Sequence, residues 1–192
     1  MTVYISTENL CFLILIIDYI KMLLIEYVRN YITFSLPVYA LYIFRDARVK
    51  MLFFVVGYLF SVIVTILLKL FFQSPTPTVD PLYFNILIKN RDYFEKLVSY
   101  EMFGMPSGNA MLASFSVVYI STAIQRLDYI CLCTFLFVVV NDVIFQCHFP
   151  EQVAVGCLIG IIIGYLSYLT CGRFIRGVQK EKQEDYAMTT LN

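Results

Sequence analysis

Histidine is almost absent from this chain of 192 residues, and charged residues of either sign are scarce. The sequence has one histidine, 15% charged residues and a formal net charge of zero at pH 7. Because the basic residues are scattered, the sequence indicates neither a nucleic-acid partner nor an acidic one. It also lacks an Asn-X-Ser/Thr sequon, so glycosylation gives no indication of sidedness.

Hydrophobic residues are abundant, at 60% of the chain. Several apolar runs approach the length needed to cross about 30 Å of hydrocarbon, which predicts an all-α, polytopic transmembrane bundle of about six helices. The six cysteines fall within or beside these runs, so we expect packing residues and no disulfide framework, metal site or other cofactor. We expect no cleavable signal peptide, because Asp18 and Lys21 interrupt the first apolar run.

The apolar runs also predict where the helices lie. The first run, Leu10 to Tyr27, carries charges and either crosses the bilayer or lies in its interface. The other predicted spans are Tyr31 to Phe44, Met51 to Leu68, Ser107 to Ile124, Tyr129 to Cys147 and Glu151 to Cys171. A polar connection from Gln73 to Met105 interrupts them, with a short surface helix expected at Asn90 to Val98.

The basic residues predict the orientation in the membrane. A cytoplasmic C-terminus places eight basic residues on the cytoplasmic side and four on the other side. We therefore expect a transmembrane domain at residues 1–172, a charged cytoplasmic tail at 173–192 with a frayed end, and the endoplasmic reticulum as a candidate membrane. Lys69, the start of the Ser107 helix and His148 then share the lumenal or extracellular face.

The single histidine, His148, lies where one apolar run ends and the next begins. If a helix starts at Pro150, the amide of Gln152 lies one turn after His148 and can reach its ring. His148 is either a reacting group or a residue that only caps a helix junction. A row of glycines at i+4 spacing continues from Gln152 and favours close helix packing: Gly156, Gly160 and Gly164.

Two other segments at the same membrane face have the chemistry of an anion site. Pro106, Ser107 and Gly108 begin a helix, where a hydroxyl and backbone N–H groups can bind phosphate or simply cap the helix. Lys69 ends a span, where it either neutralises an anion or extends to the lipid headgroups.

The order of these segments resembles the three signature motifs of the type 2 phosphatidic acid phosphatase superfamily. The matching segments are Lys69 to Pro77, Pro106 to Asn109, and Asn141 to His148, and the resemblance extends over roughly Tyr31 to Cys171. His148 to Gly160 is most similar to glucose-6-phosphatase. Lys69 to Pro77, Gly104 to Ser107 and Gln152 are also similar to dolichyl diphosphate phosphatase.

The resemblance implies a role for each retained residue. His148 would attack phosphorus to form a phosphohistidine, with Gln152 holding the other ring nitrogen. Ser107, Gly108 and Lys69 would bind the phosphoryl oxygens and neutralise their charge.

Other positions of the family pattern are changed. Thr76 stands where the pattern has arginine, Asn109 where it has the histidine that protonates the leaving group, and Asn141-Asp142 where it has Ser-Arg. Loss of a general acid costs on the order of 10² to 10⁴ in rate. A carboxylate at Asp142 would also repel the phosphate that the pattern's arginine attracts.

We therefore predict a phosphatase-like membrane protein with weak or absent catalysis, which retains binding of a phosphorylated lipid or sugar. The alternative is an active phosphohydrolase on a lipid (di)phosphate or sugar phosphate. The phosphate leaving group of a lipid diphosphate needs less protonation than an alcohol, and Arg91 could replace a missing arginine. A further alternative is a structural membrane subunit.

Overall fold

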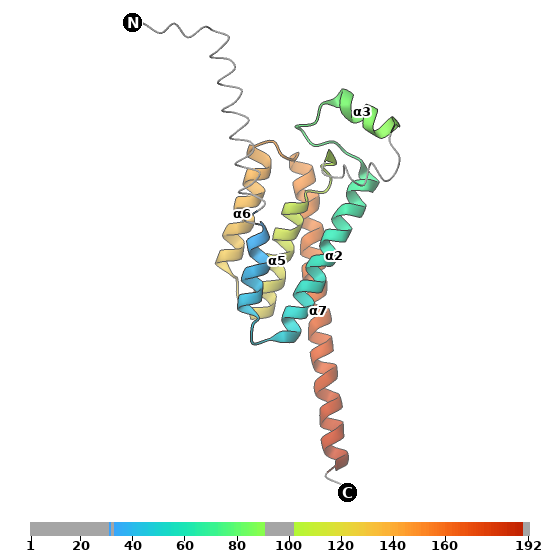
Figure 1. Cartoon of the computed structure of the whole chain (residues 1–192). Helices are drawn as coiled ribbons and strands as arrows, with labels where there is room; N and C mark the ends of the chain where they lie inside the picture. The colour runs from blue at the N-terminus through green and yellow to red at the C-terminus, as the bar shows by residue number, and fades with distance from the viewer. Residues whose placement is uncertain (1–30, 32, 91–101, 190–192) are drawn as a thin grey trace, which may run out of the picture.

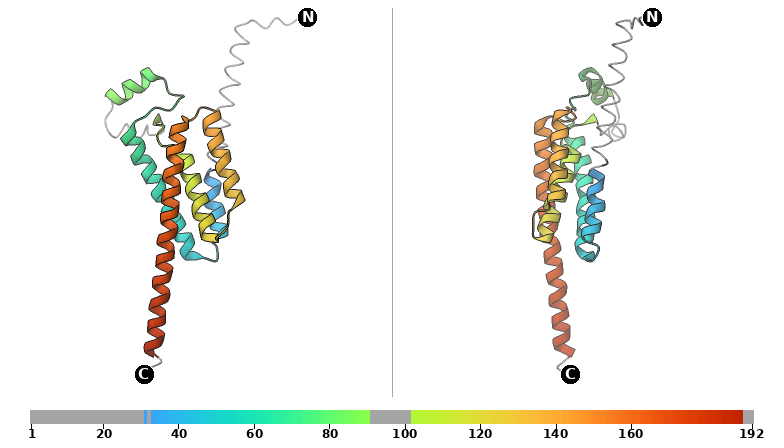
Figure 2. Two further views of the ribbon diagram at one scale, coloured as in Figure 1. Left: turned by 180° about the vertical axis from the view of Figure 1, so that it is seen from behind. Right: turned by 90° about the vertical axis from the view of Figure 1, so that its left-hand side faces the viewer.

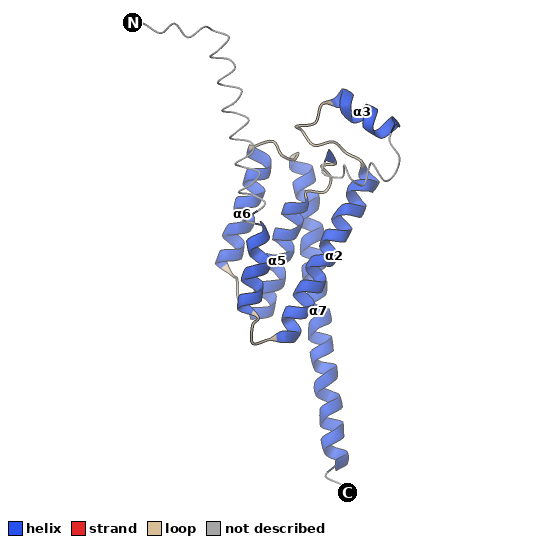
Figure 3. Cartoon of the chain, viewed as in Figure 1, coloured by secondary structure: helices blue, strands red, loops and turns tan. Residues whose placement is uncertain are grey.

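A computed structural model describes residues 31, 33–90 and 102–189 of the chain. Apart from turns and one isolated bridge between Pro75 and Phe103, these residues are helical (Figure 3). The helices are Thr33–Ile43, α2 (Arg48–Phe72), α3 (Pro81–Asn90), α5 (Gly108–Ile124), α6 (Tyr129–Ile144) and α7 (Pro150–Thr189), arranged as in Figure 1. The predicted all-α class is confirmed.

The helix α5 lies inside the bundle and packs against α2, α6 and most extensively α7 (Figures 1 and 2). The glycines of α7 that face α5 follow the predicted i+4 row, and they are Gly156, Gly160 and Gly164. A Cβ atom on Gly156 would lie 2.5 Å from the carbonyl oxygen of Ser107, and one on Gly164 would lie 2.8 Å from that of Phe115. Only glycine therefore allows the two backbones to approach so closely.

An aromatic cluster fills the bundle between α2 and α5. The buried ring of Phe54 has its centroid 5.4–6.5 Å from those of Phe44, Tyr58, Phe115 and Tyr119. These separations are typical of attractive aromatic pairs. Because Phe44 directly follows the helix Thr33–Ile43, the cluster also attaches that helix to α2 and α5.

Two of the described helices, α2 and α7, are long and apolar enough to cross a membrane. The outer face of α2 exposes many large apolar side chains, among them Leu52, Val56, Leu59, Phe60, Ile63, Leu67 and Phe71. Soluble monomers rarely expose apolar patches of this extent. Thr33–Ile43, α5 and α6 are apolar but shorter, at 10–17 residues. The chain has the features of a membrane protein, with fewer full-length spans among its described residues than predicted.

The structure corrects several predicted helix ends. The helix α7 does not end at Cys171 with a frayed tail but continues to Thr189, beyond the rest of the bundle (Figures 1 and 2). Gly172 and Gly177 do not end the helix, because a glycine inside an exposed helix costs only about 1 kcal/mol. The residues from Gln179 to Gln183 are all good helix formers and continue it. The helix α2 is longer than predicted, and α6 ends at Ile144 instead of Cys147.

The connection after α2 contains a helix that was not predicted. The helix α3 begins with Pro81, and Asp80 caps it by accepting a hydrogen bond of 2.8 Å from the backbone N–H of Leu82. An acidic cap followed by proline is a standard helix start. The predicted run Leu10 to Tyr27, and the predicted helix Asn90 to Val98 apart from Asn90, lie outside the described residues.

Candidate functional site

The three segments singled out in the sequence meet at one end of the bundle. They are the end of α2 with the connection after it, the start of α5, and the turn between α6 and α7 (Figures 1 and 2). These segments carry the predicted site residues Lys69, Thr76, Ser107, Gly108, Asn109, Asp142, His148 and Gln152. Helix packing thus brings together residues as far as 83 positions apart in sequence (152 − 69).

His148 and Gln152 form the contact that their spacing predicts. The helix α7 starts at Pro150, so Gln152 lies in its first turn and faces back toward the ring. The Nδ1 atom of His148 lies 3.3 Å from Oε1 of Gln152. The same oxygen accepts a hydrogen bond of 3.1 Å from the backbone N–H of Phe149.

The partners of Gln152 favour one of the two neutral forms of the His148 ring. The Nε2 atom of Gln152 donates to the carbonyl oxygen of Pro75 at 2.9 Å and to the hydroxyl of Ser74 at 3.3 Å. A carbonyl oxygen can only accept and a backbone N–H can only donate, so the amide has one possible orientation. Its oxygen faces His148, which favours a proton on Nδ1 and a lone pair on Nε2.

Ser74, Pro75 and Gly104 support Gln152, although the sequence analysis gave them no role at the site. The backbone N–H of Gly104 donates to the carbonyl oxygen of Ser74 at 2.7 Å, which joins the two loops. A Cβ atom on Gly104 would overlap the amide of Gln152. The sequence feature that points to such supporting residues is Gln152 itself, because the side-chain amide of a buried glutamine needs several hydrogen-bond partners.

Ser107 has the predicted position at the start of α5, but its hydroxyl has protein partners. Its Oγ accepts a hydrogen bond of 3.3 Å from the backbone N–H of Ala110, as an N-cap does. The hydroxyl donates to Oδ2 of Asp142 at 2.5 Å. The backbone N–H of Ser107 donates to the carbonyl oxygen of Gln152 at 3.0 Å.

Asp142 is fully buried at the end of α6 and contacts both Ser107 and His148. Its carboxyl group accepts from Ser107, and its carbonyl oxygen accepts a hydrogen bond of 3.1 Å from the backbone N–H of His148. The start of a helix attracts anions through its N–H groups and its dipole. Asp142 thus places an anionic group of the protein at the start of α5, where the sequence predicted a phosphate site.

Lys69 and Thr76 are also buried, with 7% and 8% of their surface exposed. Lys69 lies in the last turn of α2. The hydroxyl of Thr76 lies 3.2 Å from that of Thr78, and these two hydroxyls form a hydrogen bond. An aliphatic hydroxyl carries no charge, so Thr76 cannot neutralise phosphate as an arginine would.

Three further residues of the family pattern are neighbours of those already described: Gly108 and Asn109 follow Ser107, and Asn141 precedes Asp142. Gly108 begins α5 close to Thr65 of α2, and Asn109 is half-buried in the same first turn. The side chain of Asn141 donates to the carbonyl oxygen of Phe137 at 2.6 Å, within its own helix. Asn141 is therefore engaged with α6, while its neighbour Asp142 contacts the site.

The site is closed. Ser107 and Asp142 have no exposed surface, Gln152 has 1% and His148 has 8%.

Comparison with known proteins places the chain in a family. No curated protein and no solved structure matches it. A family model described as the PAP2 superfamily matches residues 50–176, about two thirds of the chain. The matched region contains all eight predicted site residues and the helices α2, α5 and α6 almost completely. The chain therefore belongs to the PAP2 superfamily, as its resemblance to type 2 phosphatidic acid phosphatases predicted.

Proposed function

We propose that this protein is a PAP2-superfamily membrane protein with weak or no phosphatase activity. It is a bundle of about six membrane helices, with the candidate site on the lumenal or extracellular side and the end of α7 in the cytoplasm. Its ligand is a phosphorylated lipid or sugar, which the altered site binds weakly. The family match and the apolar outer surface of α2 support the membrane assignment.

The hydrogen bond between Ser107 and Asp142 carries this proposal. A hydroxyl bonded to a carboxylate at 2.5 Å makes one of the strongest hydrogen bonds found in proteins. A phosphate group must displace this bond and then remain beside the Asp142 carboxylate, whose charge repels it. The charged side chain that the family pattern has at Thr76 and the proton donor that it has at Asn109 are both absent, so fewer groups compensate that cost than in the family pattern.

An active phosphohydrolase is the second candidate, and the geometry of His148 favours it. The hydrogen bonds of Gln152 favour a proton on Nδ1, and this tautomer has its lone pair on Nε2, as a nucleophile requires. A lipid diphosphate is the most suitable substrate for such an enzyme, because its phosphate leaving group needs little protonation in the absence of a general acid.

Phosphate release by the purified protein distinguishes these two functions. The substrates are a polyisoprenyl diphosphate, phosphatidic acid and glucose 6-phosphate, each added in the same detergent. The control is His148→Ala, which removes the nucleophile. We expect the unmodified protein to release no more phosphate than the control from any of the three.

Release that the His148→Ala substitution abolishes would overturn the proposal and establish an active enzyme. The substrate that supports this release would then give the substrate class. Circular dichroism and gel filtration of both proteins show whether each is folded, so that a loss of activity is not a loss of structure.

A further inference from the structure

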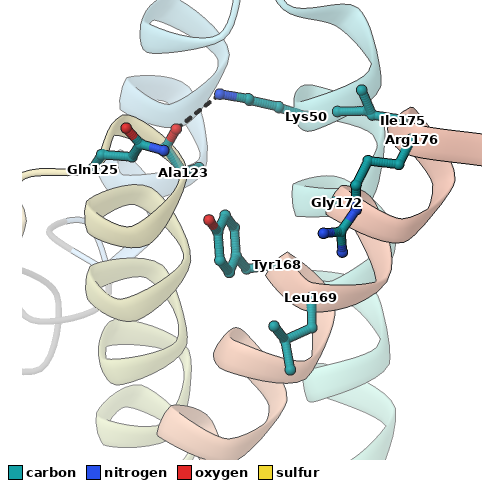
Figure 4. A pocket seen from close by; sticks show the side chains of 8 residues that line it. All are labelled: Lys50, Ala123, Gln125, Tyr168, Leu169, Gly172, Ile175 and Arg176. Carbon is teal, nitrogen blue, oxygen red and sulfur yellow. Dashed lines mark hydrogen bonds between the residues drawn. The ribbon is translucent and has the colours of Figure 1, made fainter. Parts of the chain in front are cut away.

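Figure 4 shows a pocket of about 390 Å³. It lies at the end of the bundle opposite the candidate site, because its lining includes the start of α2 and the end of α5. Lys50 at the start of α2 and Gln125 just after α5 contribute to its wall. The helix α7 contributes Tyr168, Leu169, Gly172 and Arg176. None of these residues belongs to the candidate phosphate site.

The helices separate this pocket from the candidate site by about the thickness of a membrane. Ser107 and Gln125, which cap the two ends of α5, are 18 positions apart (125 − 107), and at 1.5 Å per residue the helix between them spans about 27 Å. The hydrocarbon core of a bilayer is about 30 Å thick. With the candidate site at one membrane surface, the pocket therefore lies at the other surface, at the depth of the lipid headgroups.

The side chains of the pocket combine two cations with apolar groups. Lys50 donates a hydrogen bond of 2.8 Å to the carbonyl oxygen of Ala123, near the end of α5, and its ammonium group carries three donor protons. Arg176 brings a guanidinium group from α7, on another wall of the pocket (Figure 4). The described residues that line the pocket include no carboxylate. An anion between Lys50 and Arg176 would be attracted by both charges.

The apolar part of the pocket favours a lipid over a free anion. Tyr168 and Leu169 line it beside the two cations, and these side chains suit the glycerol and first acyl carbons of a lipid. A Cβ atom on Gly172 would meet no atom within 4 Å, so this side of the pocket is open. Inorganic phosphate could use the cations but would gain nothing from the apolar wall.

We propose that this pocket binds one anionic phospholipid of the leaflet opposite the candidate site, with its headgroup phosphate between Lys50 and Arg176. The lipid bridges α2, α5 and α7 and holds them together at this end. The site is independent of any chemistry at His148, so it stands whether the protein is an enzyme or not.

Native mass spectrometry of the full-length protein in detergent tests this proposal. The added probes are phosphatidylglycerol, phosphatidylcholine and inorganic phosphate. We expect one phosphatidylglycerol to bind more tightly than phosphatidylcholine, and Lys50→Gln or Arg176→Gln to weaken it about tenfold each. We expect inorganic phosphate to compete poorly, and equal competition by phosphate would overturn the lipid assignment.

Matched variants separate a specific site from general attraction to a basic surface. Arg173→Gln makes the same charge change on α7 at a residue that does not line the pocket. We expect this variant to bind phosphatidylglycerol within about twofold of the unmodified protein. A loss equal to that of Arg176→Gln would mean that only the net charge of α7 matters, and the proposed site would be wrong.

A second pair of variants tests the shape of the pocket without changing its charge. Gly172→Leu should fill the pocket and block the lipid, whereas Gly177→Leu on the same helix should not, since a Cβ atom on either glycine meets no other atom. Equal lipid binding by both variants, each with unchanged thermal stability in the absence of lipid, would contradict the proposal.

Discussion

The two halves of the candidate site differ in how far they retain the family pattern. The histidine half consists of His148 and Gln152 with the loops that hold them, and its hydrogen bonds suit a nucleophile. The phosphate half consists of Ser107, Asp142 and their neighbours, and it holds an acidic group of the protein at the start of α5. The histidine half thus keeps hydrogen bonds that suit a nucleophile, whereas the phosphate half carries a different charge from that of the family pattern.

The difference indicates which features the fold itself requires. Gln152 connects the start of α7 to the loops after α2 and before α5, so its loss would loosen the packing of three segments. Asp142 of the phosphate half also joins segments, because its side chain accepts from Ser107 and its carbonyl oxygen accepts from the backbone N–H of His148. Both halves therefore contribute hydrogen bonds to the packing, and they differ in the charge that they present.

Restoring the phosphate half should have the largest effect. We expect the triple variant Thr76→Arg, Asn109→His, Asp142→Arg to release phosphate about 10³-fold faster than the unmodified protein, because it regains a general acid and two cations. The assay is phosphate release from a polyisoprenyl diphosphate, phosphatidic acid and glucose 6-phosphate. Addition of His148→Ala should abolish the gain. A folded triple variant with no release would show that the histidine half is not competent either.

Removing only the negative charge at Asp142 should have the next largest effect. Asp142→Asn can still accept the hydrogen bond from Ser107 but no longer repels an anion. We expect it to bind orthovanadate, an analogue of phosphate, about tenfold more tightly than the unmodified protein, as measured by calorimetry in detergent. Ser107→Ala in the same background should reverse much of the gain. Unchanged vanadate affinity in Asp142→Asn would mean that this carboxyl group does not control the site.

Loss of Gln152 should act on stability instead of anion binding. Gln152→Leu leaves the carbonyl of Pro75 and the N–H of Phe149 without their present partner, so we expect a loss of about 2 kcal/mol in the free energy of unfolding. Thermal unfolding in detergent measures it. Asn141→Leu is the control, since Asn141 is less buried and its side chain donates to a carbonyl oxygen of its own helix. Equal losses in both variants would contradict the role given to Gln152.

The smallest expected effect is at Gly104. Gly104→Ala adds a methyl group that overlaps the amide of Gln152, so the amide must shift and the free energy of unfolding should fall by about 1 kcal/mol. Gly172→Ala is the matched control, because its added Cβ atom meets open space. The same thermal unfolding assay serves both. A Gly104→Ala protein as stable as the control would indicate that Gln152 is held less firmly than its hydrogen bonds suggest.

The sequence by itself determined the helical class, the family and the local contacts. Apolar runs predicted the described helices except α3, because the number of apolar residues needed to span or line a bilayer is fixed by its thickness. The contact between His148 and Gln152 was predictable because Gln152 follows His148 by four positions and lies in the first turn of the helix that begins at Pro150, so its side chain can reach back without tertiary information. The glycine row of α7 was predictable for the same reason.

Only the tertiary structure determined which residues from distant segments contact Ser107 and Gln152. Asp142 precedes His148 by six positions and follows Ser107 by 35, and nothing in that spacing says that its carboxyl group meets the Ser107 hydroxyl. The supports of Gln152, namely Ser74, Pro75 and Gly104, come from loops whose path depends on how α2, α5 and α7 pack. Hydrogen bonds between distant segments follow from helix packing, and no periodicity within a single helix encodes them.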